Sequence, residues 1–217
     1  MEAGRQFMTE AWPWFAVAGL GALHGLNPGM GWLFAVALGL HRQRRSVVYL
    51  SLLPIAAGHA VSILAVAGLL ALADYLVPPR LAAIGTGFVL IGWALYHWGY
   101  GHRHRVRFGL QVGLLGLAGW SFLMATAHGA GLMLWPALMP LCGSPSLGAF
   151  VGGSWVAALL GVGLHTLAML LTIAVVAALI YEWVGLAVLR STWVNVDAVW
   201  TLALAATGAT LLALSAT

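Results

Sequence analysis

The chain has 217 residues, of which 62% are hydrophobic and 6% are charged. A soluble domain carries about 25% charged residues, so nine arginines, five acids and no lysine cannot cover a surface that faces water. Soluble enzymes, DNA-binding proteins and disordered chains are therefore excluded. The composition indicates an integral membrane protein. We expect it to interact with the lipid bilayer and not with nucleic acid.

Six apolar stretches are each long enough to cross a bilayer as a helix, which takes about 20 residues. They lie at about residues 13–38, 46–73, 81–100, 116–140, 151–181 and 196–215. The first is too long for a signal-peptide core and has mixed charges before it, so we interpret it as a retained span. The stretches do not alternate as barrel strands do. The predicted fold class is therefore an all-α membrane protein with six transmembrane helices.

Arginines gather in the loops on one side of this predicted topology. The loops that follow the first, third and fifth spans hold Arg42, Arg44, Arg45, Arg103, Arg105, Arg107 and Arg190. The opposite side has only Arg5 and Arg80. Because loops rich in arginine stay in the cytoplasm, we expect a protein of the inner (plasma) membrane with both termini outside. The single cysteine, Cys142, excludes an internal disulfide.

Histidines recur in a pattern that divides the chain into two halves. One lies in the first, second, fourth and fifth stretches: His24, His59, His128 and His165. The first two are 35 residues apart and the last two are 37 apart. We therefore predict a first repeat over 1–107 and a second over 108–217. Since each repeat has three crossings, the two are inverted, a common plan of secondary transporters.

The same four histidines share a depth in the predicted membrane. Each lies within about two residues of the midpoint of its span, or about 3 Å at 1.5 Å per residue. Polar groups are costly in lipid and often mark transport pathways. We predict that the four rings converge as ligands, although each could instead form a hydrogen bond to a carbonyl of a neighbouring helix.

Small residues and a proline accompany the histidines. Stripes at Gly21, Gly25 and Gly29, and at Ser121, Ala125 and Gly129, allow helices to approach closely. Proline removes a backbone donor, so the segment 27–29 (Asn-Pro-Gly) is expected to interrupt the first span just after its histidine. Broken helices at mid-membrane depth are tolerated where they line a site. Pro54 and Pro136 could play a similar role.

The segment from His24 to Met30, followed by Gly58-His59 and Ser62, resembles the nickel/cobalt exporter (NicO) and UreH-like branch of the lysine-exporter superfamily. The resemblance implies six or so helices in two three-helix repeats and export of a transition-metal cation. The first motif of that family reads His-x-x-Asp-x-Asp-His. Here Asn27, Gly29 and Met30 replace both acids and the second histidine.

The absence of acids restricts the substrate. Asp74, Glu182 and Asp197 all lie near span ends, and a divalent ion among neutral imidazoles would keep about two uncompensated charges. Imidazole suits nickel, copper and zinc, and thioethers select Cu(I). We expect nickel, cobalt, copper or zinc, moved as a monovalent ion, with an anion, or against protons. The expected auxiliary ligands or orienting groups are Asn27, Met30, Ser62 and Thr166.

Other functions remain open at this point. The same scaffold could export a small organic solute or an anion, which protonated histidines would bind. Paired histidines could also ligate iron in a membrane-embedded haem or metal redox protein, or could simply satisfy one another in an accessory subunit. No nucleophile triad or phosphate-binding loop occurs, so we expect no enzyme. Homo-oligomerisation stays open.

Overall fold

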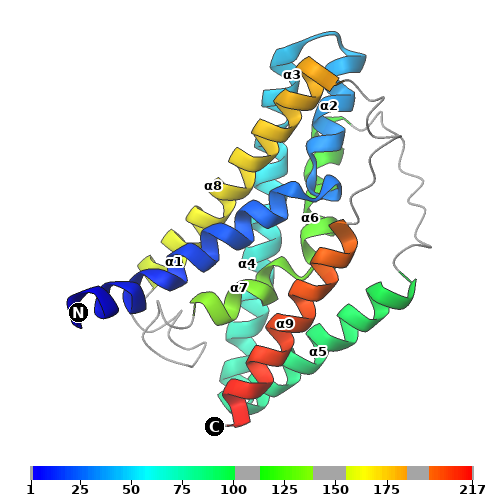
Figure 1. Cartoon of the computed structure of the whole chain (residues 1–217). Coiled ribbons are helices and arrows are strands. Elements are labelled where there is room, and N and C mark those ends of the chain that lie inside the picture. Colours follow the sequence, from blue (N-terminus) through cyan, green and yellow to red (C-terminus); the bar gives the residue numbers. More distant parts are fainter. Residues whose placement is uncertain (1, 101–112, 139–154, 185–195, 217) are drawn as a thin grey trace.

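A computed structural model describes residues 2–100, 113–138, 155–184 and 196–216 (Figure 1). In these ranges all regular structure is helical. The first half contains α1 (Glu2–Leu26), η1 (Pro28–Met30), α2 (Trp32–His41), α3 (Arg45–Leu50), α4 (Leu52–Leu76) and α5 (Pro79–Tyr100). The second half contains α6 (Leu114–Ala127), α7 (Ala130–Leu138), α8 (Trp155–Leu179), the π-helical turn η5 (Ile180–Val184) and α9 (Val196–Ala216).

Four helices in the described part are long and apolar enough to cross a membrane: Arg45–Leu69, Arg80–Tyr100, Val156–Trp183 and Ala198–Ala216. The bent pair α6 and α7 makes a fifth if it is counted as one span. The expected span at 13–38 is not among them, because the chain divides it between α1 and the short helix α2. The all-helical class is confirmed with four or five spanning helices. The boundary between the predicted repeats lies outside the described residues.

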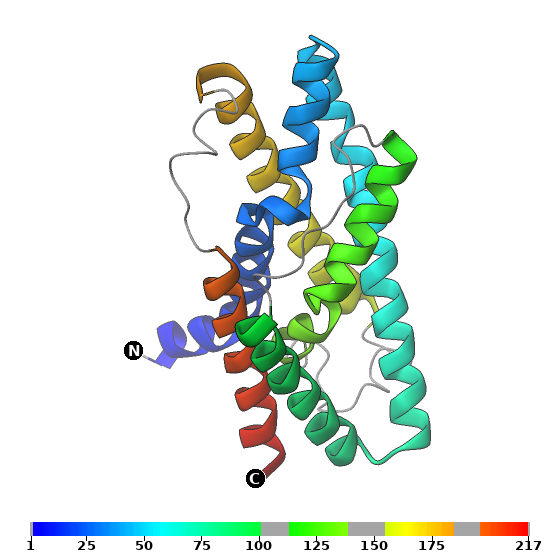
Figure 2. The same ribbon diagram turned by 90° about the vertical axis from the view of Figure 1, so that its right-hand side faces the viewer.

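Two breaks interrupt the helices near histidines. At the first, Asn27 follows the end of α1 and its Oδ1 accepts a hydrogen bond from Gly29 N at 2.9 Å. Gly31 then turns the chain at φ +132°, and the ribbon changes direction between α1 and α2 (Figure 2). This confirms the break expected at 27–29. At the second, Gly129 adopts φ +68° between α6 and α7, which differ in direction by 58°. Pro136 lies inside α7 and breaks nothing.

The helices pack in three main pairs, α1 with α8, α4 with α6, and α5 with α9. Each pair is brought together by small residues. A methyl group on Gly21 would collide with the backbone oxygen of His165, and one on Gly58 would collide with that of Ala118. In the third pair, a methyl group on Gly208 would lie 2.9 Å from a backbone oxygen of α5. The small residues predicted to allow close approach therefore do so in α1.

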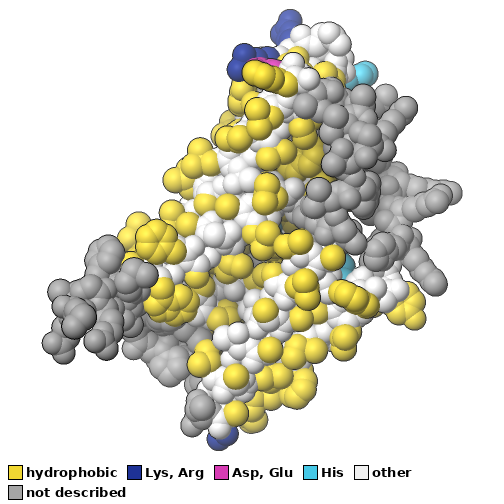
Figure 3. Space-filling view, viewed as in Figure 1, with side chains coloured by type: hydrophobic (Ala, Val, Ile, Leu, Met, Phe, Trp, Pro, Cys, Tyr) yellow, Lys and Arg dark blue, Asp and Glu magenta, His cyan; other side chains and the backbone are white. Residues whose placement is uncertain are grey.

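Charged residues lie at the two ends of the molecule. Arg45 forms an ion pair with Glu182 at 2.7 Å where the start of α3 meets η5, and Arg80 donates to Ser215 O at the opposite end. Figure 3 shows these ends as separate dark blue tips with apolar side chains between them. Both termini lie away from the α2–α3 turn (Figure 1). Cys142 and four of the arginines assigned to the cytoplasmic loops are outside the described residues: Arg103, Arg105, Arg107 and Arg190.

Candidate functional site

Three of the predicted histidines meet in the interior. His24 of α1, His59 of α4 and His165 of α8 are each at most 1% exposed. Their ring centroids are 5.2 Å apart for His24 and His59, 5.3 Å for His24 and His165, and 5.5 Å for His59 and His165. We call these three side chains the histidine cluster. It joins helices from both halves of the chain, as the sequence predicted.

Within the described part of the chain, most ring nitrogens of the histidine cluster have no hydrogen-bond partner. These are Nε2 of His24, both nitrogens of His59, and Nε2 of His165. A fifth nitrogen has a partner, because His165 Nδ1 lies 3.3 Å from Val17 O and, facing a carbonyl, donates its proton there. Buried polar groups in folded proteins are nearly always paired. Four orphaned nitrogens in one place are therefore an arrangement that a bound species would satisfy.

The rings are not arranged as a finished ligand set. Within the described residues, no group of three or more His, Cys, Asp or Glu side chains is placed so that it could hold a metal ion. One reason is visible in the ring planes: those of His59 and His165 are stacked, 11° from parallel. Stacked rings turn faces rather than nitrogen edges toward each other. A metal ion would need at least one of these rings to rotate.

His128, the fourth predicted ligand, lies beside the histidine cluster rather than in it. Trp200 of α9 contacts both, with its ring centroid 4.2 Å from that of His24 and 5.6 Å from that of His128. The neighbouring imidazole of His128 is instead His97 of α5, at 5.8 Å. His128 lies at the end of α6, at the 58° bend, where its ring contacts Trp200 of α9 and His97 of α5, while α7 beyond the bend packs against α1.

The four auxiliary residues divide into two kinds. Asn27 Nδ2 and Thr166 Oγ1 are buried without a hydrogen-bond partner among the residues that the structure describes, so both keep unused hydrogen-bonding capacity. Ser62 instead bonds Thr126 Oγ1 at 2.8 Å and ties α4 to α6. Met30 packs among apolar side chains that include Trp32, Ile55 and Met169. The described contacts of Ser62 and Met30 are therefore structural.

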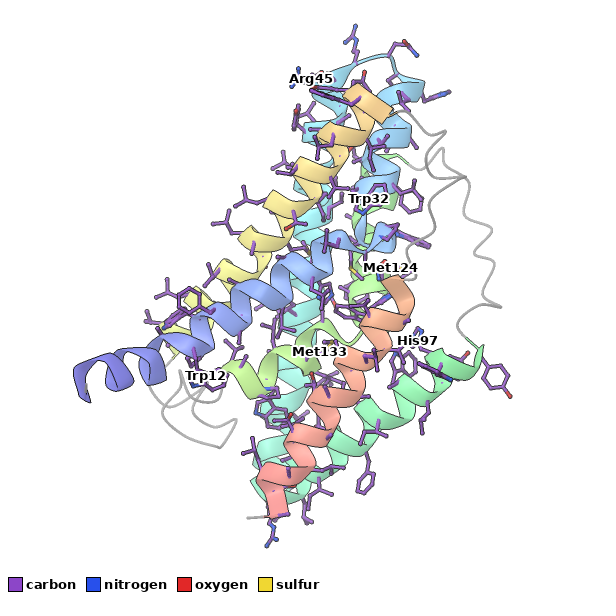
Figure 4. All side chains as sticks on the ribbon, viewed as in Figure 1. Trp12, Trp32, Arg45, His97, Met124 and Met133 are labelled. Carbon is purple, nitrogen blue, oxygen red and sulfur yellow. The ribbon has the colours of Figure 1, made fainter. Side chains whose placement is uncertain are left out.

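Four tryptophans donate hydrogen bonds to backbone carbonyls at the two breaks. None of them was identified from the sequence. At the first break, the indole of Trp32 donates to Leu26 O at 3.1 Å and that of Trp120 donates to Gly29 O at 2.8 Å. Trp32 is labelled beside this break in Figure 4. Carbonyls freed in a broken membrane helix need such donors.

At the second break, tryptophan indoles again donate hydrogen bonds to backbone carbonyls. The indole of Trp93 donates to Ala127 O, and that of Trp200 donates to His128 O at 3.1 Å. For Trp32 and Trp93 the signal is their position, since they lie six and seven residues inside the ends of predicted spans and not at the interfaces that tryptophan favours. Trp120 and Trp200 lie only four residues from a predicted span start, so their position gave no such signal. A buried indole N–H usually has an acceptor.

The histidine cluster has little electrostatic compensation. Among the side chains that the structure describes, the one acid is Glu182, which lies 17 positions beyond His165 and thus about 25 Å away along the helix. The side chains of Asp74 and Asp197 are outside the described set. A positive charge bound here meets imidazole dipoles and no described carboxylate.

Comparisons with models of protein families, with curated proteins and with solved structures find no match to this chain.

Proposed function

We propose that the protein is a secondary membrane transporter that moves a transition-metal cation through the histidine cluster. The observation that carries this proposal is the meeting of three buried imidazoles from α1, α4 and α8 with four unpaired nitrogens. Neutral imidazole is the commonest protein ligand of transition metals. The sequence has no nucleotide-binding motif, which favours a secondary mechanism.

Spacing supports the choice of substrate. A metal ion about 2.1 Å from each coordinating nitrogen places the ring centroids of its ligands roughly 5 to 6.5 Å apart. The three separations in the histidine cluster, 5.2 to 5.5 Å, fall in this range. His165 also donates its Nδ1 proton to a backbone carbonyl. Metal-ligating histidines usually make such a hydrogen bond with the ring nitrogen that does not bind the metal. The stacked rings then correspond to a state that must rotate before it binds the ion.

Charge balance restricts how the ion moves. Nickel, cobalt, copper and zinc all accept imidazole, but a divalent ion without a carboxylate would be costly to hold in a medium of low dielectric constant. The cycle therefore carries monovalent copper, moves a divalent ion together with an anion, or exchanges a divalent ion for protons on the same rings. Metal binding to histidine displaces protons, so the three imidazoles can serve both steps.

The proposed architecture is six crossings in two inverted repeats, 1–107 and 108–217, in the inner membrane with both termini outside. Helix pairing supports it. The first span of one half packs on the second span of the other in both cases, α1 on α8 and α6 on α4, and the third spans α5 and α9 pack together. Exchanging the two halves leaves this pattern unchanged. Each half also breaks its first span close to its first histidine.

The resemblance to the nickel/cobalt exporter and UreH-like branch belongs to the same proposal. It rests on His24, the Gly58-His59 pair and the broken first span. The missing acids of the family motif distinguish this chain. We propose that its ion is softer or less charged than the divalent cations that an acid-rich motif would hold.

Transport by reconstituted protein tests the proposal. Liposomes that contain a metal-sensitive dye should take up Cu⁺, Zn²⁺, Ni²⁺ or Co²⁺ through the wild-type protein, and His59→Gln and His165→Gln should abolish the flux. His41→Gln is the matched control, because His41 is exposed at the end of α2. Full flux in both cluster variants, or equal loss in the control, would contradict the proposal.

Export of a small organic solute or anion is the second candidate. It is favoured by the orientation of the stacked rings and by the unpaired Nδ2 donor of Asn27. Uptake that no metal supports, together with solute flux that depends on His59, would select it. A haem protein is less well supported, because a porphyrin has to fit between its two axial imidazoles and these three rings are in direct contact.

A further inference from the structure

We propose that the turn between α2 and α3 binds the phosphate headgroup of an anionic membrane lipid through Arg42 and Arg44. The inference does not depend on what the protein transports. It rests on the net charge of the turn, on the pairing of the neighbouring Arg45, and on an apolar helix face beside them. The turn directly precedes the candidate membrane span Arg45–Leu69, so its side chains lie at the level of the lipid headgroups.

The backbone of the turn presents two arginines close together. Arg42 N donates to Leu38 O at 3.0 Å where α2 ends, and Arg44 N donates to Gly39 O at 3.1 Å. Between them Gln43 adopts φ +51°. The turn is thus fixed by its own hydrogen bonds, while the side chains of Arg42 and Arg44 are exposed.

A third arginine at this turn is already neutralised. Arg45 Nη2 lies 2.7 Å from Glu182 Oε1 and donates to Tyr49 Oη at 3.3 Å, and the guanidinium carbon lies 5.8 Å from the centroid of the Tyr49 ring. Figure 4 labels Arg45 at this end of the molecule. In the described part of the chain, no ion pair or side-chain hydrogen bond occupies the guanidinium of Arg42 or Arg44. Three arginines against one glutamate leave two positive charges at the turn.

The rest of the chain does not balance these two charges. The sequence has five acids, and the segments outside the described residues contain none of them. Apart from Glu182, the acids lie in the first part of α1, near the end of α4 and at the start of α9: Glu2, Glu10, Asp74 and Asp197. Figure 1 shows these three parts of the helices away from the α2–α3 turn. The charge of the turn is therefore available to an anion from outside the protein.

An apolar surface begins directly beside the charged turn. Tyr49, Leu50 and Leu53 are 39%, 53% and 69% exposed and lie within about 14 Å of the turn along the helix. Figure 3 shows the basic tips at this end next to apolar side chains. A phosphate that carries acyl chains contacts both surfaces at once, with its headgroup on the arginines and its chains on the helix face. A soluble anion uses only the charge, so the arrangement favours a lipid.

The chemistry of arginine suits this ligand. Its planar guanidinium donates paired hydrogen bonds to phosphate oxygens, and each basic residue near the membrane surface adds a similar increment of affinity for anionic lipid. Two unpaired arginines predict a roughly 30-fold preference for phosphatidylglycerol over phosphatidylcholine, whose choline cancels the charge of the phosphate. Because Glu182 neutralises Arg45, it limits this preference.

The preference can be measured by native mass spectrometry. Protein in detergent would be titrated with phosphatidylglycerol or with phosphatidylcholine of the same acyl chains, and the dissociation constant of the first bound lipid determined. The wild type should prefer phosphatidylglycerol roughly 30-fold, and the double variant Arg42→Gln, Arg44→Gln less than about threefold. Both side chains are exposed, so the fold is retained. Arg80→Gln is the matched control, because it removes one positive charge at the opposite end and should keep the preference.

Glu182→Gln tests the same inference with the opposite sign. It frees Arg45 from its ion pair and should raise the preference about fivefold above the wild type. An unchanged preference in the double arginine variant, an equal loss in Arg80→Gln, or no increase in Glu182→Gln would overturn the proposed lipid site. Displacement of phosphatidylglycerol by inorganic phosphate would show a site for free anions and would equally overturn it.

Discussion

His59→Leu is the substitution that separates a functional histidine from a structural one. Both ring nitrogens of His59 are buried without a protein partner, and the side chain is 0% exposed. A buried polar group left unpaired costs roughly 1–3 kcal/mol. Leucine has a similar size and no polar atom, so it avoids this cost without leaving a large cavity. We expect metal-free His59→Leu to be more stable than the wild type and unable to transport.

The expected shift can be measured. A gain of about 1–3 kcal/mol raises the melting temperature by roughly 2–12 °C in a chain of this length. Thermal unfolding in detergent, followed by tryptophan fluorescence, would show it, with His41→Leu as the exposed control. Metal should reverse the order, because an ion at 1,000 times its dissociation constant adds about 4.1 kcal/mol to the wild type and little to the variant.

One result would refute this reasoning. A metal-free His59→Leu protein that melts well below the wild type would mean that His59 makes hydrogen bonds that hold the native state together. The histidine would then be structural, and loss of transport in any His59 variant would carry no information about a site. A metal-dependent shift that survives in His59→Leu would equally contradict a ligand role for this residue.

Three further substitutions test the fold around the histidine cluster. Gly25→Val should prevent α1 from packing on α8, because its Cβ would meet the backbone of Met169, whereas Gly19→Val faces open space; size-exclusion chromatography of tagged protein should show monodisperse material only for Gly19→Val. Ser62→Ala removes the 2.8 Å hydrogen bond to α6 and should lower the free energy of unfolding by about 1 kcal/mol, while transport continues. Loss of transport in this variant would contradict the structural role of Ser62. Glu182→Gln breaks a partly exposed ion pair and should lower the free energy of unfolding by at most about 1 kcal/mol at low salt and less at high salt; a larger loss that salt does not reduce would show a buried role.

The sequence was sufficient to predict which histidines would meet in most cases. His24, His59 and His165 lie near the middle of long apolar runs, where a polar ring has no favourable place except the bundle interior. The break at 27–29 was also predictable, since proline followed by glycine ends a helix for local reasons. In these cases the cause lies within a few residues.

The position of His128 could not be predicted in this way. The run 116–140 was interpreted as one straight span, but Gly129 adopts φ +68° and the chain bends by 58° after Ala127. Nothing local requires this bend, because Pro136 lies farther on inside α7. The bend depends on donors from other helices, Trp93 and Trp200, and partners so distant in sequence cannot be identified without the packing.

Anomalous scattering from crystals of metal-loaded protein tests the central claim most directly. We predict a peak about 2.1 Å from a nitrogen of each ring of the histidine cluster, with His59 or His165 rotated out of the present stacking. Metal-loaded crystals with no peak within ligand distance of these three rings, and with His59 and His165 still stacked, would contradict the account.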